Sequence, residues 1–470
     1  RKGKSRMTIF TGTTNGRVSF WHADMGGPPQ PRAPLSGDVT VDVAIVGGGY
    51  TGLWTALYLN RLDPALRIAV IEKRFCGYGA SGRNGGWLSG GFEWSRDKYI
   101  AAGGTREGVI AMQAAMAGSV DEVIARAAEE DIDADILRCD KLMVATCAAQ
   151  LERRDADLAE LAAWDFPASR LTTLDGAGLA SRLRVAGGVG GLAVSGSARV
   201  QPAKLVRGLA RAVERRGVAL YEGTTVTGLA PGMVTTDRGT VRAGAVIRAT
   251  EGFTPSLPGL RREWLPLNSA IIATAPLSPA QWREIGWEGH EIVADYAHAY
   301  FYAQRTREGR IAFGGRGIPY RFGSALDRDG QTQAGTIRIL HATLMRLFPS
   351  LAGIGIDHAW CGTLGVPRDW CTSVGFDPAT RMGWAGGYVG LGVSTSNVAG
   401  RTLADLVLGR QSDLVTLPWV NHKVRPWEPE PLRWGAVNAL YGLYRLSDRI
   451  EAKGGGTSIL ARIGDRIAGH

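Results

Sequence analysis

The first residues whose types and spacing could do chemistry are three glycines near the N-terminus. Gly47, Gly49 and Gly52 form a G-x-G-x-x-G pattern between an apolar run, 41–46, and a helical pattern that stops at 63–64. In such a turn the first glycine permits a tight bend, the second lets a phosphate approach the backbone, and the third lets helix and strand pack closely. The N–H groups at the start of the following helix attract phosphate. The turn therefore favours a phosphorylated ligand.

An acidic residue stands at the end of a second apolar run. Residues 67–71 predict a strand, and Glu72 follows it, 20 residues after Gly52. A carboxylate at this place accepts hydrogen bonds from a ribose and disfavours a 2′-phosphate. Turn, helix, second strand and acid together predict a dinucleotide site, and the alternative is a glycine turn that only connects strand and helix. NAD and FAD remain, and FAD is favoured because the pattern occurs once, near the N-terminus, with no second unit downstream.

A second glycine-rich stretch follows Glu72 directly. Residues 72–91 contain seven glycines, and Ser81, Arg83 and Asn84 add hydrogen-bond donors. A flexible linker would explain the composition, but the position next to a ribose-binding strand favours a loop whose backbone lies along the cofactor. The residues expected to contact the cofactor from these two stretches are Gly47, Gly49, Tyr50, Thr51, Gly52, Glu72, Lys73, Gly79, Ala80, Ser81, Arg83, Asn84, Gly85, Gly86, Trp87 and Leu88.

Composition argues against several classes of protein. The 470 residues are 45% hydrophobic and 21% charged, which is typical of a globular protein of about two domains. The net charge of +10 is not gathered into basic clusters with aromatics between them, so no nucleic-acid partner is expected. The five cysteines form no CxxC pair and no zinc spacing, which predicts reduced thiols and no metal. The absence of a long apolar run and of a secretory signal predicts a cytoplasmic protein.

Further segments carry a resemblance to a known family. VAIVGGGYTGL, GASGRNGG, RATEGFTPSLPGL at 248–260, WCGTLGVPRDW at 360–370 and AGGYVGLGVSTSNVAGRTLADLVLG at 385–409 stand in this order. On these segments the chain resembles the FAD-dependent oxidoreductases of the D-amino-acid oxidase family, most of all the γ-glutamylputrescine oxidoreductase-type members. The resemblance covers residues 17–425. It implies an α/β (α+β two-domain) fold, in which a Rossmann-like FAD-binding domain is interleaved with a mainly antiparallel β-sheet substrate domain.

The implied domains are discontinuous. Residues 17–104, 196–260 and 356–410 would form the FAD-binding domain, and residues 105–195 and 261–355 the substrate domain. Residues 411–470 would form a C-terminal helical extension with an amphipathic pattern at 435–453. This helix is expected to dock on its own protein, with a dimer contact or a membrane surface as the alternatives.

The resemblance also assigns cofactor residues further along the chain. One strand would hold the adenine, and a turn at the end of another would close over the pyrophosphate region. A glycine-rich turn at 386–392 would direct the N-terminus of a predicted helix, 393–408, toward the flavin's pyrimidine edge, where the helix dipole stabilises negative charge. The residues so assigned are Val226, Ala249, Thr250, Gly362, Gly390, Gly392, Val393 and Ser394.

The family oxidises C–N bonds. The resemblance implies that a neutral amine passes hydride from its α-carbon to flavin N5 and that the imine then hydrolyses, without a dedicated side-chain base. Ala312 stands where sarcosine-oxidase-like members have a lysine that assists reaction with oxygen, so oxygen and another electron acceptor both remain open. Some relatives attach flavin through a cysteine near the position of Gly362. Cys361 is one residue away, and noncovalent FAD is expected.

Residues 291–306 are the first candidates for substrate contact. Period-two alternation predicts a strand with His298, Tyr300 and Tyr302 on one face, where aromatic rings hold an amine or are simply half-buried in the sheet. Arg316 is the candidate for binding a substrate carboxylate, and a surface position is the alternative. The expected substrate is a small amine or amino acid, which the motifs do not specify further. A non-catalytic FAD-binding module is the alternative from a different class.

Overall fold

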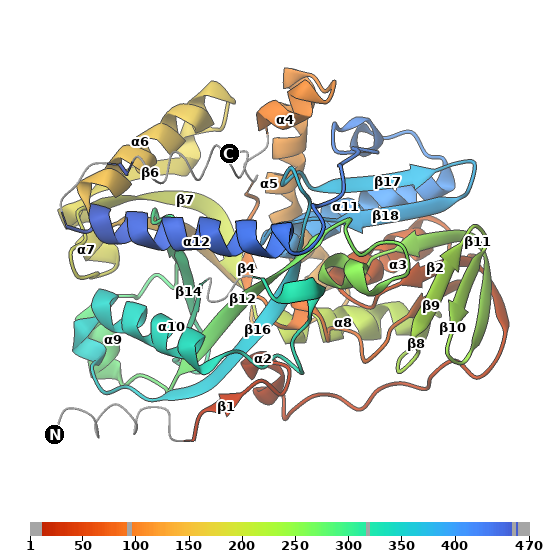
Figure 1. Ribbon diagram of the computed structural model, residues 1–470, viewed down its shortest axis with the longest axis horizontal. Helices are drawn as coiled ribbons and strands as arrows, with labels where there is room; N and C mark the ends of the chain where they lie inside the picture. Colours follow the sequence, from red (N-terminus) through yellow and green to blue (C-terminus); the bar gives the residue numbers. More distant parts are fainter. Residues whose placement is uncertain (1–11, 92–95, 316–319, 454–456, 459–470) are drawn as a thin grey trace.

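The computed structural model describes residues 12–91, 96–315, 320–453 and 457–458. These residues form two β-sheets, each with helices packed against it (Figure 1). In the view of Figure 1 the first sheet lies to the right and the second to the left, and the chain passes between them several times. The two sheets with their helices form the two-domain α/β fold that the sequence predicts.

The first sheet is built around the strand that leads into the glycine turn. Its order is β17-β18-β11-β2-β3-β8, with β9 and β10 added beside β11. β2 pairs in parallel with both β3 and β11, as expected for apolar runs buried on both faces. The bounds are β2 Val39–Val46, β3 Ile68–Ile71, β8 Ala219–Tyr221, β9 Val226–Ala230, β10 Met233–Thr236, β11 Gly239–Arg248, β17 Ser373–Asp377 and β18 Met382–Gly386.

Helices cover one face of the first sheet. Alternate residues of β2 point to opposite faces, so that Val43 and Ile45 pack under the helices while Ala44 and Val46 face the β9–β10 side. The helix Tyr50–Leu62 starts directly after the glycine turn and lies beside the helix Gly392–Leu408. The bounds of the helices are α3 Tyr50–Leu62, α5 Arg106–Glu129, α8 Pro202–Arg215 and α11 Gly392–Leu408.

The second sheet is mainly antiparallel. Its order is β1-β16-β12-β15-β14-β13-β5-β7-β4, with β6 beside β7, and only the β1–β16 and β13–β5 pairs are parallel among its described pairings. The strand bounds are β1 Thr14–Asn15, β4 Trp87–Leu88, β5 Leu137–Ala145, β6 Leu171–Asp175, β7 Gly190–Arg199, β12 Leu265–Thr274, β13 Ile292–Asp295, β14 Phe301–Arg305, β15 Ile311–Gly315 and β16 Ile356–Val366.

Further helices accompany the second sheet. One face of β12, β15 and β16 packs in an apolar core with α9 and α10. A last helix, α12, lies across the sheet at the front of Figure 1. The bounds are α2 Phe20–Ala23, α4 Arg96–Ala101, α6 Ala148–Ala163, α7 Gly176–Arg182, α9 Pro279–Ile285, α10 Ala334–Leu347 and α12 Leu432–Glu451. Short 3-10 helices occur at Ala80–Gly82, Ala168–Arg170, Glu251–Ser256, Phe322–Ser324, Pro349–Leu351 and Asp413–Thr416.

The layers divide the chain differently from the predicted domain boundaries. α5, predicted in the substrate domain, packs with α3, α8 and α11 on the first sheet. β16, predicted in the FAD-binding domain, pairs with β12 in the second sheet. β7 runs from residue 190 and is cut by the predicted boundary at 196. Sequence pattern predicts that such elements exist, but the sheet that each one joins depends on pairing between residues far apart in the chain.

One described helix, α5, is long and apolar enough by composition to cross a membrane. Its residues Val109, Met112, Met116, Val120 and Val123 are buried among the other helices of the first sheet. A buried core helix of a globular protein has this same composition. We therefore describe α5 as part of the core.

Candidate cofactor site and active site

The glycine turn after β2 has the geometry that its sequence predicts. Gly47 has a φ of +112°, and a Cβ there would lie 2.4 Å from the carbonyl oxygen of Ala249. A Cβ on Gly52 would lie 2.0 Å from the carbonyl oxygen of Gly47. Only glycine fits either place. α3 begins at Tyr50, so its first N–H groups stand directly at the turn and offer positive dipole ends to phosphate.

Glu72 stands at the end of β3 beside this turn. Its Oε2 accepts a hydrogen bond from the N–H of Gly48 at 2.8 Å, and its Oε1 accepts one from the N–H of Arg74 at 2.9 Å. Burial raises the pKa of this carboxyl. Because each carboxylate oxygen can accept a second hydrogen bond, both remain able to accept from a ribose. Lys73 is exposed next to it, and Val226 begins β9.

The loop at 79–86 is held in one shape by its own polar groups. The Asn84 amide donates to the carbonyls of Ala80 at 3.2 Å and Ser81 at 3.0 Å, and it accepts from the N–H of Gly86 at 2.8 Å. The Ser81 hydroxyl accepts from the N–H of Tyr50 at 2.8 Å, which ties the loop to the start of α3. The stretch is therefore an ordered loop against the glycine turn and not a linker. Asn84 closes the loop with its side chain.

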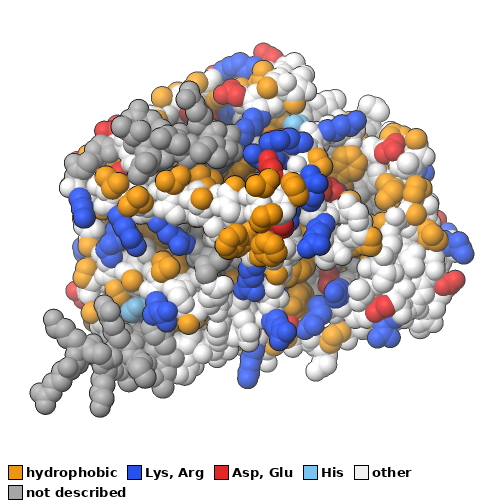
Figure 2. Space-filling view, in the orientation of Figure 1, with side chains coloured by type: hydrophobic (Ala, Val, Ile, Leu, Met, Phe, Trp, Pro, Cys, Tyr) orange, Lys and Arg blue, Asp and Glu red, His pale blue; other side chains and the backbone are white. Residues whose placement is uncertain are grey.

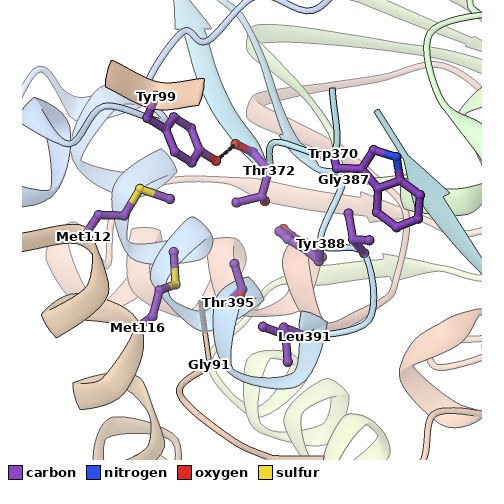
Figure 3. A pocket seen from close by; sticks show the side chains of 11 residues that line it. Gly91, Tyr99, Met112, Met116, Trp370, Thr372, Gly387, Tyr388, Leu391 and Thr395 are labelled. Carbon is purple, nitrogen blue, oxygen red and sulfur yellow. Dashed lines mark hydrogen bonds between the residues drawn. The ribbon is translucent and has the colours of Figure 1, made fainter. Parts of the chain in front are cut away.

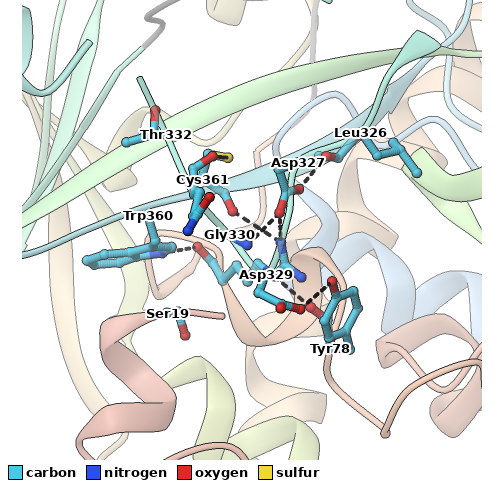
Figure 4. A network of polar contacts seen from close by, with 12 residues as sticks. Ser19, Tyr78, Leu326, Asp327, Asp329, Gly330, Thr332, Trp360 and Cys361 are labelled. Atoms are coloured by element: carbon cyan, nitrogen blue, oxygen red, sulfur yellow. Dashed lines mark hydrogen bonds and ion pairs between the residues drawn. The ribbon is translucent and has the colours of Figure 1, made fainter. Parts of the chain in front are cut away.

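Arg83 anchors the same loop to the second sheet. Its Nε donates to the Tyr78 carbonyl at 2.7 Å, and its Nη1 donates to Asp327 Oδ1 at 2.8 Å. The two charged side chains are 1% and 2% exposed. Figure 4 shows this network together with Cys361 and Asp329. Arg83 is thus mainly a structural anchor, although its buried Nη2 has no hydrogen-bond partner in the described part of the chain and remains a donor.

The N-terminal arm fixes the loop from the other side. Ser19 Oγ donates to the carbonyl of Gly82 at 2.8 Å, and Trp21 Nε1 donates to the carbonyl of Asn84 at 2.8 Å. Both residues are buried, and their partners are far away in the sequence. Sequence reasoning did not assign these two side chains a role. The sequence signal for them is the segment SFWHADM at 19–25, which resembles the Trp-led N-terminal arm of the D-amino-acid oxidase family.

A second helix N-terminus lies close to the first. The Thr51 hydroxyl in the first turn of α3 is 2.8 Å from the Tyr388 hydroxyl, in the turn that precedes α11. In that turn Gly390 has a φ of +117°, with open space around it. α11 begins at Gly392, and Ser394 Oγ donates to the Ser89 carbonyl at 2.6 Å. The α11 start and the loop that follows Glu72 are therefore joined at one edge of the first sheet.

An apolar pocket opens at the same turn. Figure 3 shows Tyr388, Leu391 and Thr395 facing Met112 and Met116 of α5 across it. Burial raises the pKa of the Tyr388 hydroxyl. The side chains that surround the start of α11 are thus mostly uncharged. In such a setting the helix dipole is the main source of positive potential.

Glu251 is a buried carboxyl that sequence reasoning missed. It follows β11 with a φ of +42°, and it accepts hydrogen bonds from the N–H groups of Gly365 at 2.8 Å and Tyr388 at 3.1 Å. Burial raises its pKa to about 7. It therefore joins β16 to the turn before α11. The signal that could have found it is an acid three residues after the end of a buried strand, a place similar to that of Glu72 directly after β3. The two preceding residues, Ala249 and Thr250, lie against the glycine turn, and their predicted contact with the cofactor stays a prediction.

Comparisons with known proteins agree with this geometry. The family described as FAD dependent oxidoreductase matches residues 42–406, which is more than half of the chain. The chain belongs to this family. It is 31% identical over 397 residues to a probable oxidoreductase OrdL of Rhizobium meliloti, covering 82% of this chain and 88% of the relative. It is 29% identical over 400 residues to the gamma-glutamylputrescine oxidoreductase of Escherichia coli, covering 83% and 89%. The solved glycine oxidase of Geobacillus kaustophilus superposes with a TM-score of 0.68 at 22% identity, covering 82% and 99%.

As a member of the FAD-dependent oxidoreductase family, the chain uses FAD, and its residues fit that cofactor. Cβ atoms are absent at the glycine turn, the Glu72 oxygens can still accept hydrogen bonds, and the Arg83 Nη2 has no hydrogen-bond partner in the described part of the chain. Glu72 would hold the adenosine ribose, and the glycine turn with the start of α3 would hold the pyrophosphate.

The Cys361 side chain of this flavoenzyme faces away from the loop at 79–86. Its side chain belongs to the core shared with α10, on one face of β16. Its neighbours face the loop instead: Trp360 Nε1 donates to the Arg83 carbonyl at 2.9 Å, and a Cβ on Gly362 would lie 3.4 Å from the Arg83 Cβ. Because successive residues of a strand point to opposite faces, Cys361 is not placed to bond to the flavin. This agrees with noncovalent FAD.

Ala312 is buried in an apolar cluster beneath the N-terminal arm. The cluster includes Phe20, Trp21 and Trp360, and Ala312 is 2% exposed within it. A lysine at this place would have to put its charge among aromatic rings. The arm therefore accounts for an uncharged residue where sarcosine-oxidase-like members have lysine.

Of the predicted substrate residues, Tyr302 lies beside the loop at 79–86. A Cβ on Gly85 would lie 2.8 Å from its ring, and a Cβ on Gly314 would lie 2.2 Å from it. Its hydroxyl is 2.7 Å from Ser269 Oγ on β12. Trp87 packs edge-on against it at 6.3 Å. Ser269 was not predicted, because nothing in the pattern of β12 distinguishes a serine that lines a site from one that fills a sheet.

The alternation predicted His298 beside Tyr302 on one face of a strand. This prediction was wrong. β14 begins at Phe301, and His298 lies in the turn before it. The imidazole stacks on Tyr444 at 5.7 Å, with its Nε2 3.1 Å from Glu451 Oε1 of α12. It therefore joins α12 to the second sheet. Tyr300, just before β14, is half-buried, and Arg316 lies outside the described residues.

The same turn contains a buried carboxyl that makes stability depend on pH. Asp295 accepts a hydrogen bond from the N–H of Phe301 at 3.1 Å. Burial, with a smaller contribution from Asp448, raises its pKa to about 7, while Arg346 and the backbone donors act in the opposite direction. The folded protein then holds a proton that the unfolded chain releases near pH 4. This stabilisation is complete below pH 4 and is lost as pH rises through 7.

We expect the Asp295→Asn variant to lose less stability than the wild type between pH 5 and pH 8. The difference should be at most about 3 kcal/mol, since stability falls by about 1.4 kcal/mol per pH unit over the roughly two units between pH 5 and the folded pKa. Urea unfolding of both proteins at the two pH values, with FAD in excess, measures it. Asp377→Asn is the matched control, because that carboxyl is exposed and its pKa is lowered. Equal pH slopes for wild type and Asp295→Asn would contradict the expectation.

Proposed function

We propose that this flavoenzyme oxidises the C–N bond of a small amine or amino acid. The observation that supports the proposal most is the contact between Gly85, in the loop at 79–86, and the Tyr302 ring. The Tyr302 hydroxyl is hydrogen-bonded to Ser269. This places a half-buried, uncharged polar pair directly beside the loop. Such a place suits a neutral amine, whose nitrogen lone pair is available to assist loss of hydride from the adjacent carbon. Bound FAD supplies the electron acceptor for this hydride.

The chain's own residues would orient the substrate and tune the site. Tyr302 and Ser269 offer hydroxyls to a polar group, and Trp87 forms an aromatic wall beside them. The N-terminus of α11 supplies positive potential without a charged side chain. Glu251 fixes the turn before that helix by accepting two backbone N–H groups. Arg316 stays the predicted partner for a substrate carboxylate.

The second part of the proposal concerns the acceptor of the electrons. Ala312, buried with Phe20 and Trp21, provides no cation to assist reaction with oxygen. This favours a dehydrogenase that passes electrons to a different acceptor over an oxidase. The names of three relatives suggest the first compounds to test as substrates. They are γ-glutamylputrescine and glycine, and sarcosine from the sarcosine oxidase subunit beta of an Arthrobacter species.

The test is anaerobic mixing of the purified protein with these compounds. Bleaching of the flavin by one amine supports the proposal, and subsequent admission of air distinguishes the acceptors: peroxide formation indicates an oxidase, and its absence a dehydrogenase. A flavin that no amine or amino acid reduces, while dithionite does, would favour a non-catalytic FAD-binding protein and contradict the proposal.

The Tyr302→Phe variant tests the site itself. Loss of one hydrogen bond to the reacting amine should lower the rate of flavin reduction about fivefold, because such a bond contributes on the order of 1 kcal/mol. Tyr296→Phe is the control, since that hydroxyl bonds Asp157 instead, at 3.3 Å. Stopped-flow reduction over a range of amine concentrations separates the rate from the binding constant. Equal rates for the two variants would remove Tyr302 from the site.

A further inference from the structure

The outer side of α12 gathers exposed apolar side chains. Leu432, Leu446 and Ile450 are 66%, 46% and 43% exposed. At the start of the helix, Phe322 is 58% exposed and packs edge-on against Trp434 at 6.3 Å. Leu432 and Phe322 are the two most exposed large apolar side chains of the described residues. Scattered apolar residues are ordinary on a surface, but a contiguous group indicates an interaction. We call the side of the helix that carries Leu432, Leu446 and Ile450 the α12 face; Trp434, two residues after Leu432, lies on another side of the helix, where it packs against Phe322.

The helical spacing makes this group a continuous stripe. Positions 432, 436, 439, 443, 446 and 450 recur every three or four residues and so share one side of the helix. They are Leu, Ala, Ala, Leu, Leu and Ile, without a charge among them. A 20-residue helix extends the stripe over about 30 Å. The acidic residues of α12, Asp448 and Glu451, lie on the opposite side and bind the second sheet.

Positive charge borders the stripe. Arg449 and Lys453 are exposed toward the end of α12, and Arg338 and Arg346 are exposed on α10. Figure 2 shows the band of hydrophobic side chains over α12 with Lys and Arg along its border and few Asp or Glu. The whole chain has a net charge of +10. An apolar stripe with a basic border is the pattern of a helix that lies in a membrane interface.

We propose that the α12 face docks on an anionic lipid bilayer, with α12 lying in the plane of the headgroups. A second copy of the chain is the less favourable occupant, because a twofold contact would bring the Arg449 borders of both copies together. An anionic surface instead attracts those residues.

α12 is attached firmly enough to hold the enzyme on that surface. Asp448 accepts hydrogen bonds from the N–H groups of His298 and Ala299, both at 2.8 Å. Glu451 pairs with Arg153 at 2.8 Å. On its inner side, Tyr441 shares an apolar core with Val389 of the turn before α11. A bilayer on the α12 face would therefore lie one layer of side chains from the flavin-site turn.

The test is flotation of the FAD-loaded protein with vesicles. We expect the wild type to float with phosphatidylcholine vesicles that contain phosphatidylglycerol, and to float less with pure phosphatidylcholine or at high salt. Leu446→Glu with Ile450→Glu should reduce the bound fraction at least about tenfold, because two apolar contacts become charges. Arg449→Gln should reduce it about fivefold. The control is Leu62→Glu with Leu137→Glu, residues that are 39% and 38% exposed elsewhere.

Flavin content and far-UV circular dichroism must match the wild type in every variant. Loss of flotation in the α12 variants with retention in the control supports the proposal. Failure of the wild type to float, or undiminished flotation of Leu446→Glu with Ile450→Glu, overturns it. A wild-type dimer in sedimentation that this variant converts to a monomer, without flotation of either, identifies a second copy as the occupant and also overturns it.

Discussion

The Gly52→Ala variant is expected to purify without its flavin. An added Cβ would lie 2.0 Å from the carbonyl oxygen of Gly47 and 3.2 Å from the Ile45 side chain. Backbone atoms cannot yield as a flexible side chain can, so the start of α3 must move away from the end of β2. The N–H groups that face the pyrophosphate then lose their alignment. We expect the affinity for FAD to fall by more than about 100-fold, which corresponds to roughly 2.7 kcal/mol.

The measurement is the ratio of flavin to protein absorbance after purification, followed by titration of the stripped protein with FAD. Gly435→Ala is the matched control, because Gly435 lies within α12 and a Cβ there meets nothing within 4 Å. That variant should keep its flavin and gain about 0.5–1 kcal/mol in stability, since alanine is the better helix former. A Gly52→Ala protein that binds FAD as tightly as the wild type would contradict the assignment of this turn.

Removal of the Arg83 side chain should produce the largest loss of stability. Arg83 and Asp327 form an ion pair at 2.8 Å with 1% and 2% exposure, so the Arg83→Met variant leaves a carboxylate buried without its partner. Breaking such a pair costs about 3–5 kcal/mol. The loop at 79–86 also loses its bond to the Tyr78 carbonyl. We therefore expect weaker FAD binding together with the lower free energy of unfolding.

Urea unfolding with and without excess FAD measures both effects. The Arg83→Met/Asp327→Asn double variant should be more stable than Arg83→Met alone, because the uncompensated charge is gone. Arg67→Met is the control: Arg67 pairs with Asp42 at 2.8 Å, but the two side chains are 62% and 37% exposed. Its loss should change the unfolding midpoint little, since water solvates both charges. Similar effects of Arg83→Met and Arg67→Met would show that the buried pair does not anchor the loop.

The cofactor half of this protein was largely predictable from local sequence. The turn at Gly47, Gly49 and Gly52, with Glu72 after the next strand, has the predicted conformation. The reason is that the strand, the turn, the helix, the second strand and the acid all lie within about 30 residues of chain. The strand–turn–helix unit has few alternatives once the glycines are placed. The loop at 79–86 also lies against that turn, as its position after Glu72 suggested.

The partners of those residues were decided by the tertiary structure. Arg83 was expected to donate to the cofactor, and the fold adds a partner that local sequence did not indicate, because its Nη1 binds Asp327, 244 residues away. His298 was expected beside Tyr302, but it stacks on Tyr444 of a helix near the end of the chain. Periodicity states which residues share a face, but not which distant element covers that face.

Two further features depended on the fold in the same way. The face of β16 that Cys361 occupies follows from pairing with β12, whose register no local pattern specifies. The amphipathic pattern of α12 predicted a helix with one buried side. The structure confirms this, because α12 packs that side against its own protein. Only the packed structure shows that the opposite side is apolar as well, with Leu432, Leu446 and Ile450 exposed. Local sequence determines conformation and periodicity, whereas burial is a property of surfaces that meet after the chain has folded.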